Sequence, residues 1–259
     1  MFIRERDESM KRIAIITGAS SGFGKEFAVQ LDKKFSCIDE YWLVARSTDK
    51  LKKVSEKLSH KCKILSLDLT KDESVNEIVK AVVKEHAFVK MLINSAGFGK
   101  IGTVRSMDDS DISDMLKVNC TALTLLTKRL IPYMDDNSRI INISSSAAFL
   151  PQPEFAVYAA SKSYVLSFTR ALNAELRRKD VFATAVCPGP SETNFFNIAE
   201  TGGKTPWYKK YCMAPPEKIV ALAILDSINM QEVSVYGFAM NAFRMASKFV
   251  PHRLILKFW

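Results

Sequence analysis

The sequence of 259 residues contains no apolar run that approaches the roughly 18 residues needed for a transmembrane helix. It also lacks low-complexity tracts and internal repeats at solenoid spacing, so we expect neither a disordered linker nor a repeat architecture. The first residues carry too many charges for a secretory signal peptide. We therefore expect residues 1–10 to form a flexible N-terminal arm.

Cysteine and histidine are also scarce. The five cysteines form no Cys-x-x-Cys pair, and of the three histidines only His60 lies close to a cysteine. We predict no metal site and reduced thiols, as in a cytoplasmic protein. The net charge of +9 suits nucleic acid, an anionic membrane or an anionic cofactor. Nothing in the sequence besides the net charge supports nucleic-acid binding, so we predict no nucleic-acid partner.

Short apolar strands alternate with helical segments along most of the chain. This order predicts an α/β, doubly wound Rossmann fold, with a parallel sheet of about seven strands and helices on both faces. The length suits one such domain, residues 11–259. The expected strands are 12–17, 41–45, 63–67, 91–94, 139–144, 181–186 and 233–236, and the expected later helices are 49–58, 72–86, 108–134, 156–178 and 215–228.

Right-handed crossovers place ligands at the carboxyl ends of such strands. The first strand runs into the turn Gly18-Ala-Ser-Ser-Gly22-Phe-Gly24 and then into a helix. This order lets backbone N–H groups and a helix N-terminus approach a pyrophosphate. Candidate site residues stand at five expected strand ends, namely Gly18, Arg46, Asp68, Asn94 and Ser145.

Arg46 and Ser47 follow the second strand, where an NAD-selective site usually carries an acid for the ribose 2′-hydroxyl. Asp39 and Glu40 precede that strand and are not assigned this role. A guanidinium suits the 2′-phosphate of NADP(H), so we predict NADP(H) in preference to NAD(H). The alternative is that Arg46 is an ordinary solvated loop residue.

Tyr158 and Lys162 lie four residues apart at the start of an expected helix and therefore share one face. An ammonium beside a phenol would lower the tyrosine pKa from about 10 and make the phenol a usable acid and base. Taken alone, such a pair more often means a half-buried ring and a solvated amine. Asn119, in a largely apolar helical stretch, taken alone indicates a structural hydrogen bond.

Four groups of residues form a joint pattern, namely Thr17-Gly18-x-x-x-Gly22-x-Gly24, Asn94-Ser-Ala-Gly97, Tyr158-Ala-Ala-Ser-Lys162, and Pro188-Gly189 with Thr193. By this pattern the sequence, from residue 11 to about residue 236, resembles the short-chain dehydrogenase/reductase family. Ser145 lies thirteen residues before Tyr158, the family spacing, and Ser95 departs from the family's Asn-Asn-Ala-Gly element.

The resemblance implies that a nicotinamide cofactor and a secondary alcohol or ketone exchange hydride. Tyr158 would be the general acid/base, Ser145 would bind the substrate oxygen, and Lys162 would lower the tyrosine pKa and hold the nicotinamide ribose. Asn119 would position a water that relays protons to Lys162. The expected cofactor-binding residues are Thr17, Gly18, Ser20, Ser21, Gly22, Phe23, Gly24, Arg46, Ser47, Asp68, Leu69, Asn94, Ala96, Gly97, Tyr158, Lys162, Pro188, Gly189 and Thr193.

Aromatic residues flank the catalytic positions. The expected substrate contacts are Ser145, Phe149, Phe155, Phe195 and Phe196. Such a lining favours a bulky apolar substrate, since few polar groups are available for hydroxyls. We favour a hydroxysteroid or bile-acid type alcohol, with a 3-oxoacyl or other lipid-derived ketone as the alternative. We expect segment 190–214 to cover the substrate, the alternative being an ordinary surface insertion.

Segment 240–259 is basic and amphipathic, contains no acid, and carries Pro251, which should kink any helix. We favour its packing over the pocket or against a sister subunit in a homodimer or homotetramer, with peripheral membrane contact as the alternative. A non-catalytic NADPH-binding sensor or scaffold is the alternative of a different class. It would be expected to lose a catalytic position, whereas all four are present.

Overall fold

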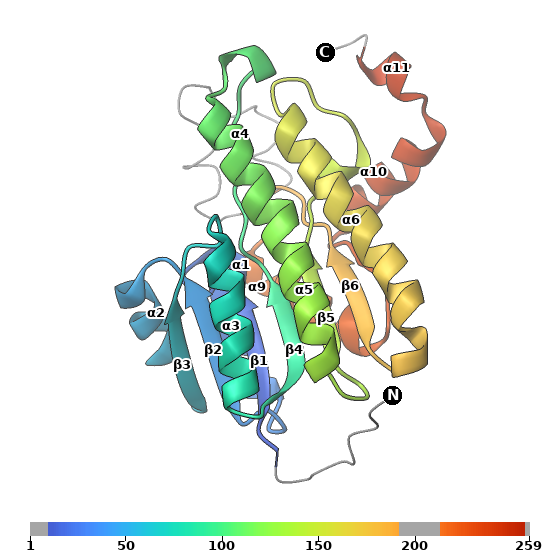
Figure 1. The fold of residues 1–259 in the computed structure, drawn as a ribbon. Helices are drawn as coiled ribbons and strands as arrows, with labels where there is room; N and C mark the ends of the chain where they lie inside the picture. The colour runs from blue at the N-terminus through green and yellow to red at the C-terminus, as the bar shows by residue number, and fades with distance from the viewer. Residues whose placement is uncertain (1–9, 192–212, 257–259) are drawn as a thin grey trace.

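The computed structural model describes residues 10–191 and 213–256. Within these ranges the chain forms a seven-stranded sheet of order β3-β2-β1-β4-β5-β6-β7, in which every neighbouring pair is parallel (Figure 1). The predicted Rossmann-like fold is confirmed. The strands are β1 (Arg12–Thr17), β2 (Glu40–Ala45), β3 (Lys61–Ser66), β4 (Phe88–Asn94), β5 (Arg139–Ile143), β6 (Phe182–Val186) and β7 (Val233–Ser234).

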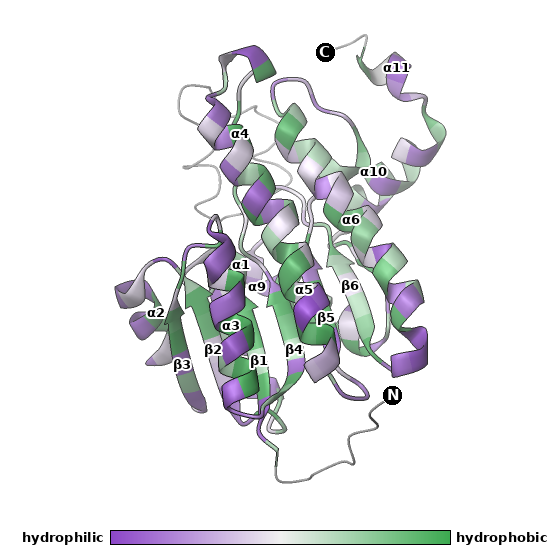
Figure 2. Cartoon of the chain, in the orientation of Figure 1, coloured by the Kyte–Doolittle hydropathy of each residue, from purple (hydrophilic) through white to green (hydrophobic). Residues whose placement is uncertain are grey.

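Helices cover both faces of the sheet. On one face lie α1 (Gly22–Lys34), α2 (Thr48–Ser55) and α9 (Pro216–Ile228), and on the other lie α3 (Asp72–Lys84), α5 (Leu123–Leu130) and α6 (Ala156–Leu176). The apolar residues of β1 alternate between these layers, because successive strand side chains point to opposite faces. Ala14 and Ile16 pack against the first layer, and Ile13 and Ile15 against the second. Figure 2 accordingly shows the central strands mostly in the colour of apolar residues.

The segment predicted as one helix over residues 108–134 is four consecutive helical pieces. They are α4 (Asp109–Leu116), the π-helix η2 (Lys117–Ala122), α5, and the 3₁₀ turn η3 (Ile131–Tyr133). Periodicity alone does not reveal the one-residue insertion that a π turn makes in a helix. The remaining 3₁₀ turns are η1 (Val104–Ser106), η4 (Ser146–Phe149) and η5 (Arg177–Lys179).

The C-terminal segment forms α10 (Phe238–Phe249) and α11 (His252–Ile255), which lie at the upper right edge of the molecule in Figure 1. The break between them falls at Pro251, as the sequence predicts, because proline cannot continue the hydrogen-bonding ladder. No helix in residues 10–191 and 213–256 is long and apolar enough to cross a membrane.

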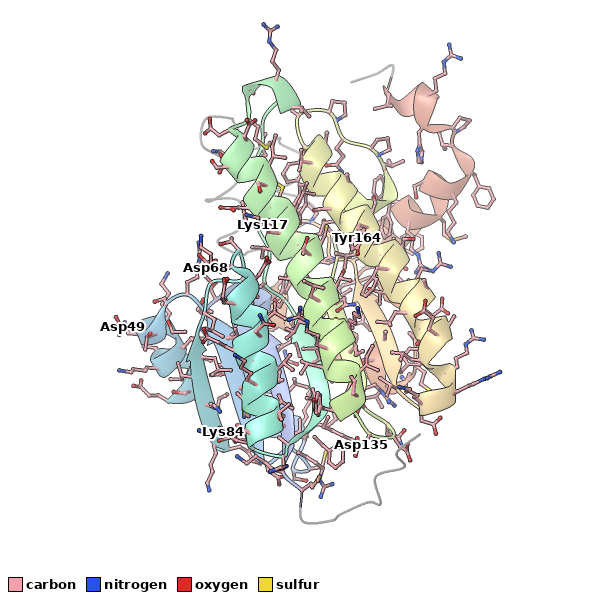
Figure 3. The ribbon with its side chains drawn as sticks, viewed as in Figure 1. Asp49, Asp68, Lys84, Lys117, Asp135 and Tyr164 are labelled. Carbon is pink, nitrogen blue, oxygen red and sulfur yellow. The ribbon has the colours of Figure 1, made fainter. Side chains whose placement is uncertain are left out.

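Strand order places the crevice for ligands between β1 and β4, where the connections turn to opposite sides of the sheet. Figure 3 marks this end of the sheet by Asp68 and the opposite end by Lys84 and Asp135. The candidate site therefore lies at the carboxyl ends of the strands, on the side of Asp68.

Candidate active site

A cavity of about 840 Å³ opens along the carboxyl ends of β1, β2, β4, β5 and β6. The residues that line it come from distant parts of the chain, from Gly18 to Phe243. Among them are the predicted site residues Ser145, Phe155, Tyr158 and Lys162. The predicted cofactor residues that also line it are Gly18, Ser20, Ser21, Gly22, Phe23, Arg46, Ser47, Asp68, Leu69, Ala96, Gly97, Pro188 and Gly189.

The turn between β1 and α1 has a backbone that favours glycine. Gly18 and Gly22 have φ values of +67° and +52°, in the left-handed region where other residues are strained. A Cβ on Gly18 would lie 2.9 Å from the backbone of Ala96. The turn ends where α1 begins, at Gly22, so that the first amides of the helix face the cavity end of the sheet. This cradle fits the pyrophosphate of a dinucleotide.

Three predicted cofactor residues lie behind the cavity wall instead of in it. Thr17 Oγ1 accepts hydrogen bonds from the amides of Ser95 (3.0 Å) and Ala96 (3.1 Å), and thereby joins the end of β1 to the end of β4. Gly24 packs so closely that a Cβ there would lie 2.4 Å from the Gly18 carbonyl oxygen. These two residues shape the turn and do not line the cavity.

Asn94 is the third of these residues and is buried at the end of β4. Its Nδ2 donates to Thr127 Oγ1 (3.0 Å) and to Asn142 Oδ1 (2.8 Å). Asn142 in turn donates to Thr169 Oγ1 (2.9 Å), which ties β4, β5, α5 and α6 together. Asn94 therefore supports the sheet under the cavity.

Tyr158 lies near the start of α6, and only 6% of its surface is exposed. Its side chain is hydrogen-bonded to that of Ser145, and Phe155 stacks on its ring with centroids 4.4 Å apart. Burial raises the pKa of Tyr158, and the hydrogen bond with Ser145 offsets only part of this rise. The phenol is therefore protonated at neutral pH, which suits a proton donor.

The predicted downward shift of the Tyr158 pKa by Lys162 is not found. Lys162 Nζ donates to the Ile143 carbonyl oxygen (2.9 Å) and lies 5.6 Å from the centre of the Tyr158 ring. At that position it does not offset the burial of the phenol. Burial also lowers the pKa of Lys162, to about 8. Tyr158 and Lys162 do share one face of α6, as their spacing predicts.

The three serines after β5 have different partners. Ser144 Oγ donates to the Lys162 carbonyl oxygen (2.7 Å), and the Ser146 amide donates to the Pro188 carbonyl oxygen (2.8 Å). Ser145 Oγ accepts from the Ala147 amide (3.1 Å) and meets Tyr158. All three line the cavity, and Ser145 is the one hydrogen-bonded to the tyrosine.

Asn119 lies in the π-helix η2 and is buried. Its Oδ1 accepts from the Phe98 amide (3.1 Å), and its Nδ2 donates to the Phe98 carbonyl oxygen (2.9 Å) and Ser161 Oγ (3.0 Å). These are the structural bonds that a buried amide requires. A Cβ on Gly97 would lie 2.9 Å from Asn119 Oδ1 and 3.2 Å from Lys162 Nζ, so only a glycine separates the two side chains. The water-relay role of Asn119 stays a prediction.

Arg46 and Asp68 stand beyond the ends of β2 and β3, at the far end of the cavity. A hydrogen bond from the Thr70 amide (3.0 Å) lowers the pKa of Asp68, with a smaller contribution from the charge of Arg46. Lys50, in α2, also lines the cavity and was not predicted. It lies in the first turn of α2, and no motif in the sequence marks it.

Two residues of α10 line the cavity and were also missed. Met240 packs on Gly189, where a Cβ would lie 2.7 Å from the Met240 sulfur. Phe243 lines the cavity and contacts Phe149, with ring centroids 6.2 Å apart. α10 therefore packs over the pocket. Packing over the pocket was one of the two arrangements favoured for the C-terminal segment.

The predicted substrate contacts separate into three groups. Phe155 lines the cavity beside Tyr158. Phe149, the last residue of η4, lines a second cavity of about 460 Å³ against α6 and α11, with Gln152 common to both cavities. Residues 192–212, and with them Thr193, Phe195, Phe196 and most of the expected cover, lie outside the described residues, as do residues 1–9 of the expected arm 1–10.

No group of three or more histidine, cysteine, aspartate or glutamate side chains within 10–191 and 213–256 is arranged to hold a metal ion.

The family model for short chain dehydrogenases matches residues 12–202, which is most of the chain. The chain belongs to the short-chain dehydrogenase family and is an oxidoreductase of the dehydrogenase/reductase type.

Two relatives and one solved structure illustrate the range of similar proteins. A sulfoacetaldehyde reductase of Chromohalobacter salexigens is 31% identical over 201 residues, covering 75% of this chain and 78% of its own. A 3-oxoacyl-[acyl-carrier-protein] reductase of Thermotoga maritima is 29% identical over 184 residues, covering 70% and 75%. A short-chain dehydrogenase from Sphingobium yanoikuyae in complex with NADPH superposes with a TM-score of 0.78 at 23% identity, covering 93% of this chain and 94% of its own. The last likeness concerns the fold.

Proposed function

We propose that this chain is an NADP(H)-dependent oxidoreductase that interconverts a secondary alcohol and a ketone on a bulky apolar substrate. The observation that carries the proposal is that apolar side chains surround Tyr158 in the cavity. Phe155 stacks on Tyr158, and Met240 and Phe243 reach the same cavity from α10. A substrate bearing many hydroxyls would find few partners on such a surface.

In the direction of reduction, the chemistry that a nicotinamide cofactor would supply when bound is hydride transfer to the carbonyl carbon. Tyr158 gives its proton to the carbonyl oxygen as the alkoxide develops, and Ser145 donates a hydrogen bond to the same oxygen. Because burial keeps Tyr158 protonated, the phenol is in the donor form before reaction. Lys162 would hold the nicotinamide ribose. Oxidation follows the same path in reverse, and the proton returns to Tyr158.

The preference for NADP(H) is proposed from the two cations at the adenine end of the cavity. Arg46 and Lys50 both line this end, and Arg46 follows directly on β2. The 2′-phosphate on the ribose of NADP(H) would form ion pairs with these two cations, whereas the ribose of NAD(H) carries only a hydroxyl at that position. We expect Arg46→Ala/Lys50→Ala to raise the KM for NADPH by more than about tenfold and to leave the KM for NADH nearly unchanged. Equal changes for the two cofactors would contradict this preference.

The class of apolar substrate is either a hydroxysteroid or bile-acid type alcohol or a 3-oxoacyl or other lipid-derived ketone. The cavity lining supports both, and the Thermotoga maritima relative, by its name, supports the second. The Chromohalobacter salexigens relative, named for sulfoacetaldehyde, supports a small polar substrate instead. Initial rates of NADPH and NADH oxidation are to be measured with oxosteroids, medium-chain ketones, 3-oxoacyl thioesters and sulfoacetaldehyde.

We expect a rate with one apolar class, and faster turnover with NADPH than with NADH. A higher kcat/KM for sulfoacetaldehyde than for every apolar compound would overturn the apolar proposal. Tight NADPH binding without turnover of any compound in the panel would favour the non-catalytic sensor or scaffold.

A homodimer or homotetramer is proposed from the family resemblance. Tyr164 of α6 supports it, since the residue is 43% exposed, stacks on Phe168 and is hydrogen-bonded to Thr124 of α5. Sedimentation velocity tests this proposal, and a monomer at micromolar concentration would contradict it.

A further inference from the structure

The outer face of α10 carries an apolar stripe. Its residues are Phe238, Ala242, Met245 and Phe249, which are four, three and four positions apart and therefore lie along one side of the helix. Phe238 is 90% exposed, Met245 52% and Phe249 77%. Two phenyl rings this exposed on one short helix indicate a surface that meets an apolar partner.

The charged side chains that the C-terminal segment itself carries have one sign. No aspartate or glutamate occurs after Glu232, while Lys248 on the flank of the stripe and Arg253 of α11 are both exposed. α10 and α11 lie together at the edge of the molecule (Figure 1, upper right). The complementary partner is therefore apolar at its centre and anionic around it.

A second copy of this chain does not meet that requirement. In a two-fold dimer through α10, the same segments would face each other. Lys248 and Arg253 would then approach their own counterparts, and the segment offers no acid to pair with them. Like charges brought together in this way oppose association.

We propose that the outer face of α10, with Lys248 and Arg253 beside it, docks on the surface of a membrane that contains anionic lipids. The rings of Phe238 and Phe249 would enter the boundary between headgroups and acyl chains, and the cations would face the headgroups. Met240 and Phe243 occupy the inner face of the same helix, so the candidate site then lies about one helix diameter, roughly 10 Å, from the lipid. The inference concerns binding and does not depend on the proposed reaction.

The test is co-sedimentation of the full chain with vesicles of phosphatidylcholine alone, or of equal parts phosphatidylcholine and phosphatidylglycerol. We expect the chain to bind the anionic vesicles and to remain in the supernatant with the neutral ones. Phe238→Ser/Phe249→Ser should lower the partition coefficient at least about tenfold, because two rings no longer leave water. Lys248→Glu/Arg253→Glu should remove the preference for anionic vesicles.

A matched control removes two apolar side chains exposed elsewhere. Val83 and Met230 are 46% and 55% exposed, outside the C-terminal segment, and Val83→Ser/Met230→Ser should bind as the unaltered chain does. Failure of the unaltered chain to bind anionic vesicles would overturn the proposal, as would equal binding by Phe238→Ser/Phe249→Ser. The unaltered chain could also bind neither kind of vesicle and form a dimer in sedimentation velocity that Phe238→Ser/Phe249→Ser does not form. In that case the face binds a second copy and the proposal is wrong. None of these binding assays measures turnover. A failure of the proposed reaction would appear only in the initial-rate measurements and would not affect this test.

Discussion

The two ends of the cavity are built differently. At the cofactor end, backbone groups and buried side chains bond directly to one another: Thr17 joins β1 to β4, and the Ala19 amide donates to the Val44 carbonyl oxygen (3.2 Å). At the substrate end, α10 has no fully buried residue and contacts the rest of the site through Met240 and Phe243.

This difference explains where sequence motifs occur. A turn in which Gly18 and Gly24 leave no room for a Cβ accepts few sequences, so it produces a recognisable pattern. A helix that presents side chains to an open cavity accepts many, since any apolar residue of suitable size makes the contact. We expect the first end to set the class of chemistry and the second end to set the choice of substrate.

Removal of the acid/base group is expected to have the largest effect. Tyr158→Phe keeps the ring that stacks on Phe155 and deletes the oxygen that meets Ser145. We expect turnover to fall by about 10²–10⁴-fold, the usual contribution of a positioned proton donor. Initial rates with the best substrate measure the loss, and a fluorescence titration should show NADPH affinity nearly unchanged. Retained turnover in Tyr158→Phe would remove Tyr158 from its proposed role.

Substitutions at two glycines, one at each end, test the comparison directly. Gly24→Ala places a Cβ 2.4 Å from the Gly18 carbonyl oxygen and must displace the turn. Gly237→Ala, before α10, meets no atom within 4 Å, although its φ of +88° strains any other residue. We expect each to lower the free energy of unfolding by about 1–3 kcal/mol, measured in urea.

The two glycine variants should differ in NADPH affinity. Gly24→Ala should weaken binding by more than about tenfold, because the displaced turn can no longer approach the pyrophosphate. Gly237→Ala should leave the affinity unchanged, since it alters only the entry to α10. Equal NADPH affinities in the two variants would show that the ends do not differ in this way.

The fold and the shared helix face of Tyr158 and Lys162 were predictable because their signals are local. Alternating strands and helices predict the Rossmann sheet, and the four-residue spacing predicts that Tyr158 and Lys162 share a helix face. The direction of the Tyr158 pKa shift was not predictable in this way. It depends on how deeply the ring is buried and on where Lys162 points, and here Lys162 points to the Ile143 carbonyl oxygen.

Other features depend on contacts between distant parts of the chain. Thr17 and Asn94 belong to the family pattern, yet their hydrogen bonds hold strands together behind the cavity wall. Met240 belongs to no motif and reaches Gly189 only because α10 folds back over the end of β6. A motif therefore identifies residues that a site requires, without separating those that touch the ligand from those that support them.

The smallest expected effect lies at the substrate end. Phe243→Ala removes a ring that lines the cavity and contacts Phe149, and we expect the KM for a bulky apolar ketone to rise about three- to tenfold, equivalent to roughly 0.6–1.4 kcal/mol. NADPH affinity and kcat should change little, because Tyr158 and the cofactor turn are untouched. Phe249→Ala is the matched control, since Phe249 lies on the same helix but faces outward, and its KM should equal that of the unaltered chain. If Phe243→Ala instead weakened NADPH binding and left the substrate KM unchanged, α10 would belong to the cofactor end, and substrate choice would have to be set elsewhere along the cavity.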